Sequence, residues 1–528
     1  MRKFSSYGPV DKKKNYYVKR EDIIDKIYNQ LIDGHYMTVW APRQCGKTWI
    51  MNEVFSKLLE NDYYNALIIN LENLKVNDDI ENIIKNISER IITKLKLNIQ
   101  QDINFKSFDL LFKKEVLKKP LILILDEFDA LDEKAISFIV SIFRYIYMTR
   151  LSDNNALLEK EYLLHGVALI GVRSVIGIEN VKSSPFNIQR SVNIPNLTYD
   201  ETKEMFKWYE KENDHIVEQN VVESIYKETC GQPGLVSWFG ELITEGYDKY
   251  EPDRNKSITI QIFEKIYSDA LYILPNNNIL NIISKAKQQP YNELILDLFK
   301  TREPKRFMFD DNLTNYLYMN GVIDKEETPD YKYYTVKFSS PFVQKRLFNY
   351  FANEYFKNIG DIFKPFEDVS EIITNDSINI SKLLKRYENY LKENRHWILK
   401  NAPRRSDLKI YEAIYHFNLY EYLINFFGNY KTTIWPEFPT GNGKVDLMIQ
   451  HFDQLYALEI KSYKDKPGFE KAIKQAAKYA GSLNLDLIYL VVFVEYIDEK
   501  NRSIYEKSYY DQETDINIET IFIEIGSK

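Results

Sequence analysis

The feature that most constrains the fold is the string APRQCGKT at Ala41 to Thr48, which lies between an apolar run and an amphipathic stretch. The run Tyr36 to Trp40 is typical of a short buried strand, and the residues after Thr48 have helical apolar spacing. Such a strand, loop and helix direct consecutive backbone N–H groups at one place, where phosphate groups bind. We expect Lys47 to contact the β and γ phosphates of a nucleotide and the Thr48 hydroxyl to bind Mg²⁺. The other loop residues are expected to contribute backbone contacts: Arg43, Gln44, Cys45 and Gly46.

A second apolar strand, Leu121 to Leu125, ends at the acidic pair Asp126 and Glu127. Ligands of a parallel sheet bind at the carboxyl ends of its strands, so we expect this pair beside the loop. Asp126 is expected to hold Mg²⁺ through water and Glu127 to polarise the attacking water, which favours hydrolysis over binding alone. A further predicted strand carries Arg173 in the place of a γ-phosphate sensor.

Length and composition indicate several folded domains. The 528 residues exceed one hydrophobic core, and 44% hydrophobic with 28% charged residues is typical of a folded protein. The sequence has no apolar run of membrane-spanning length and no apolar leader, so we expect a cytosolic protein without a membrane contact. Cys45 and Cys230 support neither a disulfide framework nor a zinc site. The net charge of −7 argues against a generally basic nucleic-acid binder.

Two alternating strands near the C-terminus place charged residues on one face. A hairpin that pairs Gln450 with Leu455 also places Asp446 opposite Glu459. Opposed like charges are destabilising unless a cation lies between them, and hard oxygen ligands suit Mg²⁺ or Mn²⁺. Lys461 shares the face of Glu459, and we expect it to orient or deprotonate a water that attacks a phosphodiester.

The N-terminal motifs resemble those of the AAA-like P-loop ATPases of the STAND and archaeal-type group. The string YYVKRED is similar to the family's adenine-side entry motif, although Lys19 replaces its usual glycine, and GQPGLV at Gly231 to Val236 is similar to its GxP motif. The resemblance implies a P-loop fold with a parallel sheet and a helical lid, in which Pro233 senses the nucleotide. The alternative for this proline is a plain turn that interrupts a helix. Ala41 replaces the loop's usual first glycine but removes no phosphate-binding N–H.

The middle of the chain is predicted to form a helix, a hairpin and a helix between about Tyr316 and Leu347. This order resembles the winged-helix domain of the same ATPases, for which we favour a structural role over a DNA contact. The following stretch, Ser381 to Ile410, has nine basic and three acidic residues, a balance of +6. It is interpreted either as a nucleic-acid contact or as a solvated helical connector.

The C-terminal charged set resembles the core of the PD-(D/E)xK nuclease superfamily, with Asp446, Glu459 and Lys461 matching its triad. The resemblance implies accessory roles for three residues on flanking helices: Glu412, Gln475 and Tyr479. The alternative is an ordinary half-exposed strand with alternating charges.

The motif departs from the superfamily pattern at its start, because Pro436 and Glu437 precede the aspartate by about ten residues. On the predicted helix after the lysine strand, Lys471, Lys474 and Lys478 recur at helical spacing. They either meet a phosphate backbone or form a solvated face.

The sequence therefore predicts an α/β protein of five parts. These are a P-loop ATPase domain over residues 1–200, a helical lid over 201–275, a winged helix over 276–352, a basic helical connector over 353–400 and an α/β PD-(D/E)xK nuclease domain over 401–528. We expect ATP with Mg²⁺ in the first part to control DNA cleavage with Mg²⁺ or Mn²⁺ in the last, in defence against foreign DNA or in a mobile element. The alternative is a nucleotide-gated sensor or scaffold whose last part only binds nucleic acid or protein. A homo-oligomer or a partner protein is left open.

Overall fold

The computed structural model describes residues 2–6, 8, 10–74, 79–99, 103–171, 190–299, 305–328, 332–357, 359–360, 362–363, 367–374, 376–400, 402–404, 410–428, 430–440 and 443–526. The chain divides into two compact units. Unit 1 comprises Met1–Ala270, Leu274–Ile282 and Phe307–Lys325. Unit 2 comprises Leu271–Ile273, Ile283–Arg306 and Glu326–Lys528.

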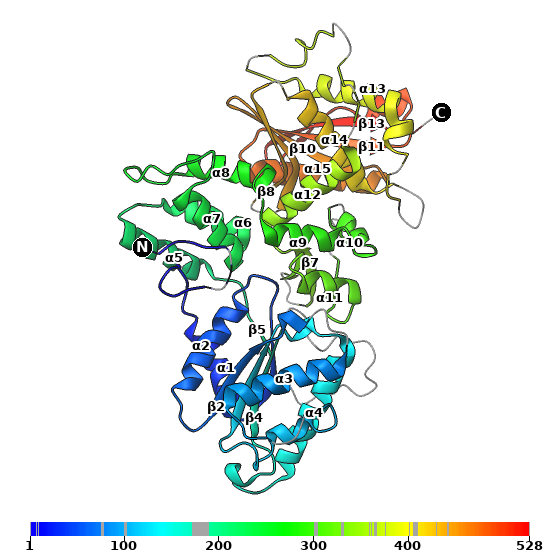
Figure 1. Cartoon of the computed structure of the whole chain (residues 1–528). Helices are drawn as coiled ribbons and strands as arrows, with labels where there is room; N and C mark the ends of the chain where they lie inside the picture. The colour runs from blue at the N-terminus through cyan, green and yellow to red at the C-terminus, as the bar shows by residue number, and fades with distance from the viewer. Residues whose placement is uncertain are drawn as a thin grey trace. The chain divides into compact units, whose positions relative to one another are not determined.

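A five-stranded sheet in the order β2-β3-β4-β1-β5 forms the centre of unit 1 (Figure 1). Its strands are β1 (Tyr36–Trp40), β2 (Asn65–Asn70), β3 (Leu121–Asp126), β4 (Leu164–Gly171) and β5 (Arg190–Asn193). Every pair in this sheet is parallel, which confirms the predicted parallel sheet. The carboxyl ends of β1 and β3 therefore lie at the same edge, where the predicted loop and acidic pair begin.

Helices cover both faces of this sheet. They are α1 (Glu21–Ile32), α2 (Lys47–Leu59), α3 (Ile80–Leu95) and α4 (Glu133–Ser152). Ile122 and Ile124 of β3 pack with α1 and α2. Leu121, Leu123 and Leu125 pack with α3 and α4 on the other face. Side chains alternate between the faces of a strand, so a strand that is covered on both faces is apolar throughout.

A helical region follows the sheet of unit 1, in the part of the sequence predicted to be a lid. Its helices are α5 (Tyr199–Asn213), α6 (Gln219–Thr229), α7 (Pro233–Glu245) and α8 (Ile260–Tyr272), and the next helix, α9 (Asn277–Ala286), lies in the range predicted to be a winged helix. α5 begins with a capping box between Thr198 and Glu201. Among the described helices of the whole chain, none combines the length and the apolar character needed to cross a membrane.

The predicted helix, hairpin and helix are present in the middle of the chain. The elements are α10 (Tyr291–Leu298), α11 (Asn312–Met319), β6 (Ile323–Glu327), β7 (Tyr334–Phe338) and α12 (Pro341–Phe356). The boundary between the two units falls within this segment, because Phe307–Lys325 belongs to unit 1 and the residues from Glu326 onward belong to unit 2. A winged-helix domain over residues 276–352 remains a prediction.

Unit 2 contains a mixed six-stranded sheet in the order β12-β13-β11-β10-β9-β8. The strands are β8 (Thr432–Thr440), β9 (Gly443–His451), β10 (Gln454–Ser462), β11 (Leu487–Val494), β12 (Ser508–Asp511) and β13 (Ile516–Glu524). β10, β11 and β13 run parallel, whereas β8, β9 and β12 pair with their neighbours in antiparallel fashion. Four helices accompany the sheet: α13 (Ile380–Ile398), α14 (Glu412–Phe426), α15 (Lys466–Ser482) and α16 (Glu499–Tyr505).

Helices also cover both faces of the sheet in unit 2. Val492 of β11 belongs to the apolar cluster formed with α15. The next residue, Phe493, stacks on Tyr415 of α14 with ring centroids 5.0 Å apart, and its centroid is 6.3 Å from that of Tyr387 on α13. α15 therefore lies on one face and α13 and α14 on the other. The α/β class is confirmed, and the assignment to the PD-(D/E)xK fold remains a prediction.

Candidate functional site

The loop between β1 and α2 has the backbone geometry that phosphate binding requires. Gly46 is the N-cap residue of α2 and has a φ of 84°, and Gln44 also has a positive φ, of 57°. These left-handed residues turn the chain sharply before Lys47, the first residue of the helix. The first N–H groups of a helix have no partner within it, so they are directed at this loop. Cys45 is buried in the loop, and burial raises the pKa of its thiol to about 11.

The side chain of Lys47 lies inside the loop. Its Nζ donates to the carbonyl oxygens of Ala41 at 2.8 Å and Pro42 at 2.9 Å. Lys47 is 8% exposed, and burial lowers the pKa of its ammonium group. A charged phosphate oxygen is a stronger acceptor for an ammonium group than a carbonyl oxygen is. The position of Lys47 therefore fits the predicted phosphate contact.

Thr48 and Asp126, the two predicted Mg²⁺ ligands, lie side by side. Oγ1 of Thr48 donates to Oδ2 of Asp126 at 3.4 Å. Asn70 donates to the same oxygen at 3.4 Å from Nδ2, and Oδ1 of Asp126 accepts the N–H of Glu127 at 3.0 Å. Burial raises the pKa of the Asp126 carboxyl. Hydroxyl and carboxylate oxygens are hard ligands, so this pair suits Mg²⁺.

Asn70 was not predicted as a site residue. It ends β2 and pairs in register with Asp126 at the end of β3. The only sequence signal was a polar residue at the end of an apolar run, NALIIN. Asn70 lies beside Asp126 because β2 is the neighbour of β3 in the sheet. The sequence of a single strand does not show which strand is its neighbour.

Glu127 follows β3 in a left-handed conformation, with a φ of 55°. This conformation costs a non-glycine residue roughly 1–3 kcal/mol, and such residues cluster at functional sites. The role of Glu127 in polarising water remains a prediction. Arg173, the predicted γ-phosphate sensor, lies outside the described residues.

The GQPG segment contacts the phosphate loop directly. Gln232, the N-cap residue of α7, donates from Nε2 to the carbonyl oxygen of Arg43 at 3.0 Å. The N–H of Gly234 donates to the carbonyl oxygen of Gln44 at 3.1 Å. A Cβ on Gly234 would lie 2.4 Å from the Oε1 of Gln44, so the close approach requires glycine. Pro233, the first residue of α7, lies between these two contacts. Its position fits both interpretations, a nucleotide-sensing proline at the loop and a turn at the start of a helix.

In unit 2, the hairpin of β9 and β10 has the predicted register. Gln450 pairs with Leu455. The same register places Asp446 across from Glu459. Oδ2 of Asp446 accepts the backbone N–H of Ile460 at 2.7 Å, which ties the Asp446 carboxylate to the strand that carries Glu459.

The three residues of the predicted triad lie together. Nζ of Lys461 is 3.1 Å from Oε1 of Glu459 and 3.9 Å from Oδ2 of Asp446. The Glu459 side chain is 0% exposed, and the side chains of Asp446 and Lys461 are 12% and 17% exposed. One ammonium group therefore lies between two carboxylates that are largely withdrawn from solvent.

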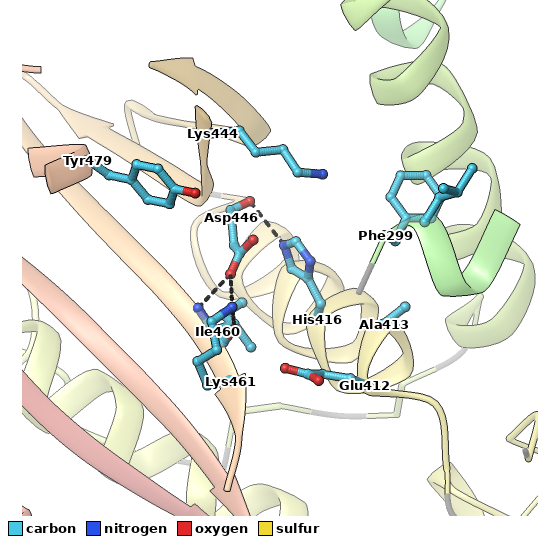
Figure 2. Close-up of a pocket in the computed structure, with 10 residues that line it drawn as sticks. Phe299, Glu412, Ala413, His416, Lys444, Asp446, Ile460, Lys461 and Tyr479 are labelled. Carbon is cyan, nitrogen blue, oxygen red and sulfur yellow. Dashed lines mark hydrogen bonds and ion pairs between the residues drawn. The ribbon is translucent and has the colours of Figure 1, made fainter. Parts of the chain in front are cut away.

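The three accessory residues lie at or beside the same pocket, which Figure 2 shows with Asp446 near its centre. Glu412 begins α14, and its Oε1 accepts the backbone N–H of Ser462 at 2.9 Å. On α15, Nε2 of Gln475 donates to the hydroxyl of Tyr479 at 2.6 Å. The pocket is lined by Leu298, Phe299, Glu412, Ala413, His416, Lys444, Asp446, Ile460, Lys461 and Tyr479.

Three residues of this region were not predicted as site residues: His416, Glu437 and Lys444. The Nε2 of His416 is 3.0 Å from the carbonyl oxygen of Asp446, and its Nδ1 is 3.5 Å from Oε1 of Glu437. Burial lowers the pKa of His416 to about 4, so the ring is neutral at pH 7. His416, Glu437 and Asp446 offer ligand atoms within 4.8 Å of one another, which is a second arrangement that could hold a metal ion.

Sequence signals for these residues were weak. Glu437 stood out only as part of the departure from the superfamily motif. Lys444 alternates with Asp446 on one strand, and this spacing of two residues was a usable signal. His416 lies one turn after Glu412 on a largely apolar helix, where a buried histidine is more often structural.

Part of the basic stretch after Ser381 is neutralised within unit 2. Four of its basic residues form ion pairs: Lys382 with Glu371 at 2.6 Å, Lys385 with Glu388 at 2.7 Å, Arg386 with Glu367 at 2.7 Å and Lys392 with Glu388 at 3.0 Å. α13, which carries them, also packs against β13. For the described part of this stretch, the contacts favour the structural interpretation over a nucleic-acid contact. The predicted lysines of α15 are exposed: Lys471, Lys474 and Lys478.

A family model described as an AAA-like domain matches residues 5–251. Residues 5–251 form an AAA-like P-loop ATPase domain. The AAA-like domain thus includes the phosphate loop, the acidic strand and the GQPG segment. No curated protein matches the sequence.

Several solved structures are similar to the chain at low identity. A Walker-type ATPase of Pyrococcus abyssi has 16% identity and a TM-score of 0.44, covering 65% of this chain and 99% of its own. The Aeropyrum pernix Orc1 protein in complex with DNA has 12% identity and a TM-score of 0.32, covering 63% and 92%. The RuvB Holliday junction branch migration motor of Thermotoga maritima has 15% identity and a TM-score of 0.33, covering 61% and 92%. With TM-scores below 0.5, these likenesses add no function to that of the AAA-like domain.

Proposed function

We propose that this protein is an ATP-dependent switch that controls a metal-dependent nuclease acting on DNA. The observation that carries the proposal is the cluster in unit 2, in which Lys461 lies 3.1 Å from Glu459 and 3.9 Å from Asp446 beside a pocket. The AAA-like domain provides the switch, because nucleotide binding and hydrolysis are the chemistry that its loop and acidic strand suit.

In the AAA-like domain, the phosphates of ATP would bind at the loop before α2. Lys47 would transfer its hydrogen bonds from the carbonyl groups of the loop to the β and γ phosphates. Thr48 and Asp126 would hold Mg²⁺. Glu127 would polarise the water whose oxygen bonds to the γ phosphorus while the bond to the β-phosphate oxygen breaks.

The formal charges near the pocket of unit 2 favour a divalent cation. Four carboxylates and two ammonium groups leave an excess of two negative charges: Glu412, Glu437, Asp446 and Glu459 against Lys444 and Lys461. His416 adds no charge at pH 7, since burial lowers its pKa to about 4. Uncompensated charge that is withdrawn from water is destabilising, and carboxylate oxygens are the ligands that Mg²⁺ and Mn²⁺ prefer.

Asp446 and Glu459 would hold this cation, which would stabilise the charge that develops on the phosphate. Asp446 is already oriented by the N–H of Ile460. Lys461 would orient or deprotonate the water whose oxygen bonds to phosphorus as one P–O bond of the backbone breaks. Tyr479 lines the same pocket, where its hydroxyl accepts a hydrogen bond from Gln475 and would contact a phosphate oxygen.

A plasmid cleavage assay tests the proposal. Supercoiled DNA is incubated with the full chain and Mg²⁺ or Mn²⁺, with and without ATP. We expect cleavage that requires the divalent cation, that Glu459→Gln abolishes and that Asp453→Asn, a control in the exposed turn of the same hairpin, leaves unchanged. No cleavage by the wild type under any of these conditions would leave the nucleotide-gated sensor or scaffold as the function.

The same assay tests the control by ATP. If the AAA-like domain gates the nuclease, Lys47→Ala should change the dependence of cleavage on ATP although it alters no residue of unit 2. Identical cleavage by this variant and the wild type at every ATP concentration would mean two independent enzymes in one chain.

A further inference from the structure

A second lysine, Lys444, faces the pocket of unit 2 close to the predicted triad. It lies on β9 two residues before Asp446, so the two side chains leave the same side of the strand. Lys444 and Lys461 both line the pocket, and Figure 2 shows their ammonium groups on different sides of Asp446. Lys444 belongs neither to the predicted triad nor to its three accessory residues.

The position of Lys444 is set by a carboxylate behind it. Its Nζ forms an ion pair with Oε2 of Glu437, whose side chain is 0% exposed. The same oxygen accepts a hydrogen bond of 2.7 Å from Nε2 of Gln344 on α12. The Phe299 ring, with its centroid 6.0 Å from Nζ, limits the ammonium group on another side.

Glu437 reaches this place through an unusual backbone conformation. It has a φ of 54° in the middle of β8, directly after Pro436. A left-handed residue other than glycine costs roughly 1–3 kcal/mol and persists where the surroundings require it. Here the conformation places a buried carboxylate where it holds Lys444 at the pocket.

The two lysines pair with different carboxylates. Lys461 lies between the two carboxylates of the triad, at 3.1 and 3.9 Å. Lys444 has its partner Glu437 on the buried side, and its side chain is 31% exposed. An ammonium group has three N–H donors, and the half-buried position of Lys444 in the pocket wall lets it contact a ligand there.

We propose that Lys444 binds a non-bridging phosphate oxygen of the nucleic-acid backbone and that Glu437 and Gln344 position it. This inference rests on the proposed nuclease function and names a substrate-binding residue of that site. Asp446 and Glu459 would hold a cation that offsets their charge, and Lys444 would contribute a further positive charge to the phosphate. Lys444 takes no part in proton transfer, since it binds the substrate.

The test compares Lys444→Gln with the wild type in cleavage and in DNA binding. We expect a raised KM with a smaller change in kcat, because the lysine binds substrate before the bond is broken. Binding of a short duplex with Ca²⁺ in place of the active cation should weaken, and its log–log salt dependence should become shallower by about 0.9, the value for one phosphate contact. Lys444→Arg should keep most of the affinity, since it keeps the charge.

Two controls separate this inference from the proposed function. Lys500→Gln removes an exposed lysine of α16 and should leave KM and the salt dependence unchanged. Lys444→Gln should gain at least as much stability from Mn²⁺ as the wild type, since it removes a positive charge near the carboxylates, and this gain shows that the variant is folded and its cation site intact. Cation-dependent cleavage by the wild type together with unchanged KM and salt dependence in Lys444→Gln would overturn the assignment of Lys444 alone. Absence of cleavage in the wild type would overturn the proposed function, and this inference with it.

Discussion

The carboxylate of Asp446 accepts the backbone N–H of Ile460 at 2.7 Å, so a side chain of β9 is bonded to the main chain of β10. Ile460 lies between Glu459 and Lys461, and this contact therefore sets the distance between the aspartate and the other two members of the triad. An asparagine at position 446 has an oxygen that accepts the same bond. Asp446→Asn would therefore remove the carboxylate charge while keeping the hydrogen bond to Ile460.

The first prediction concerns the phosphate loop. Lys47→Ala should abolish nucleotide binding, because it removes the side-chain cation that the loop encloses. Lys57→Ala, on the same helix and paired with Asp25 at 2.6 Å on the surface, should bind nucleotide like the wild type. Binding is measured by titration with a fluorescent ATP analogue, and wild-type affinity in Lys47→Ala would refute the role given to this lysine.

The acidic strand yields a separate prediction. Glu127→Gln should bind ATP with near-normal affinity and lose turnover, because the amide keeps the shape of the side chain but polarises water poorly. The rate of ATP turnover is measured as steady-state phosphate release. Equal rates in the variant and the wild type would assign the polarisation of water to another residue.

The contact between α7 and the loop can be tested with a single methyl group. In Gly234→Ala, the new Cβ would lie 2.4 Å from Oε1 and 2.7 Å from Cβ of Gln44, so the two segments must separate. We expect a loss of stability of about 1–3 kcal/mol, typical of overpacking, and weaker nucleotide binding.

Gly481→Ala is the matched control for this variant. A Cβ on this residue of α15 meets nothing within 4 Å, so the change should be neutral or stabilising. Denaturant unfolding compares the two variants. Equal stabilities would show that the loop accommodates α7 at a greater distance without cost.

The stability of unit 1 should depend on pH through His165. Burial lowers its pKa to about 4, and the neutral ring fits its partners: Nδ1 faces the guanidinium of Arg150 at 3.0 Å and Nε2 faces the carbonyl oxygen of Ile32 at 2.7 Å. The folded-state pKa is below the ordinary value of 6.5, so the unfolded chain binds more protons between these values. The stability that the neutral His165 ring contributes to unit 1 is complete above pH 6.5 and is lost as the pH falls toward 4.

Urea unfolding at pH 7 and pH 5 measures this effect. His165 should account for a loss of about 2 kcal/mol on acidification, and His165→Gln should show a smaller difference between the two pH values. His396→Gln, at an exposed position of α13, should keep the wild-type difference. A wild-type difference in His165→Gln would mean that other groups carry the pH dependence.

The parts of the fold that depend on local pattern were predictable from the sequence. The apolar run at Leu121–Leu125 forms a buried strand that ends in Asp126, and the hairpin register that pairs Gln450 with Leu455 is confirmed. Both follow from alternation and turn length within a short segment. The expected proximity of Thr48 and Asp126 follows from the same rules, since both lie at the carboxyl edge of one parallel sheet.

The parts that depend on contacts between distant segments were not predictable. The contact between Gln344 and Glu437 joins residues 93 positions apart, and nothing in either segment indicates the other. The contacts of the basic stretch were not predictable for the same reason, because Lys392 pairs with Glu524, which lies 132 residues later in the sequence. Counting charges in a window does not show the carboxylates that fold against it.

Binding of a divalent cation by Asp446 and Glu459 is measured by thermal unfolding with and without Mn²⁺ in the absence of nucleotide. A ligand that binds only the folded state stabilises it by about 2.7 kcal/mol at a hundredfold excess over its Kd. Wild type and Asp453→Asn should gain stability on addition of Mn²⁺. Asp446→Asn should be as stable as the wild type or slightly more stable without metal, since it relieves repulsion with Glu459, and should gain much less with it. An equal gain in all three proteins would remove Asp446 from the cation site and leave Glu459 and Lys461 as an ordinary charged strand face.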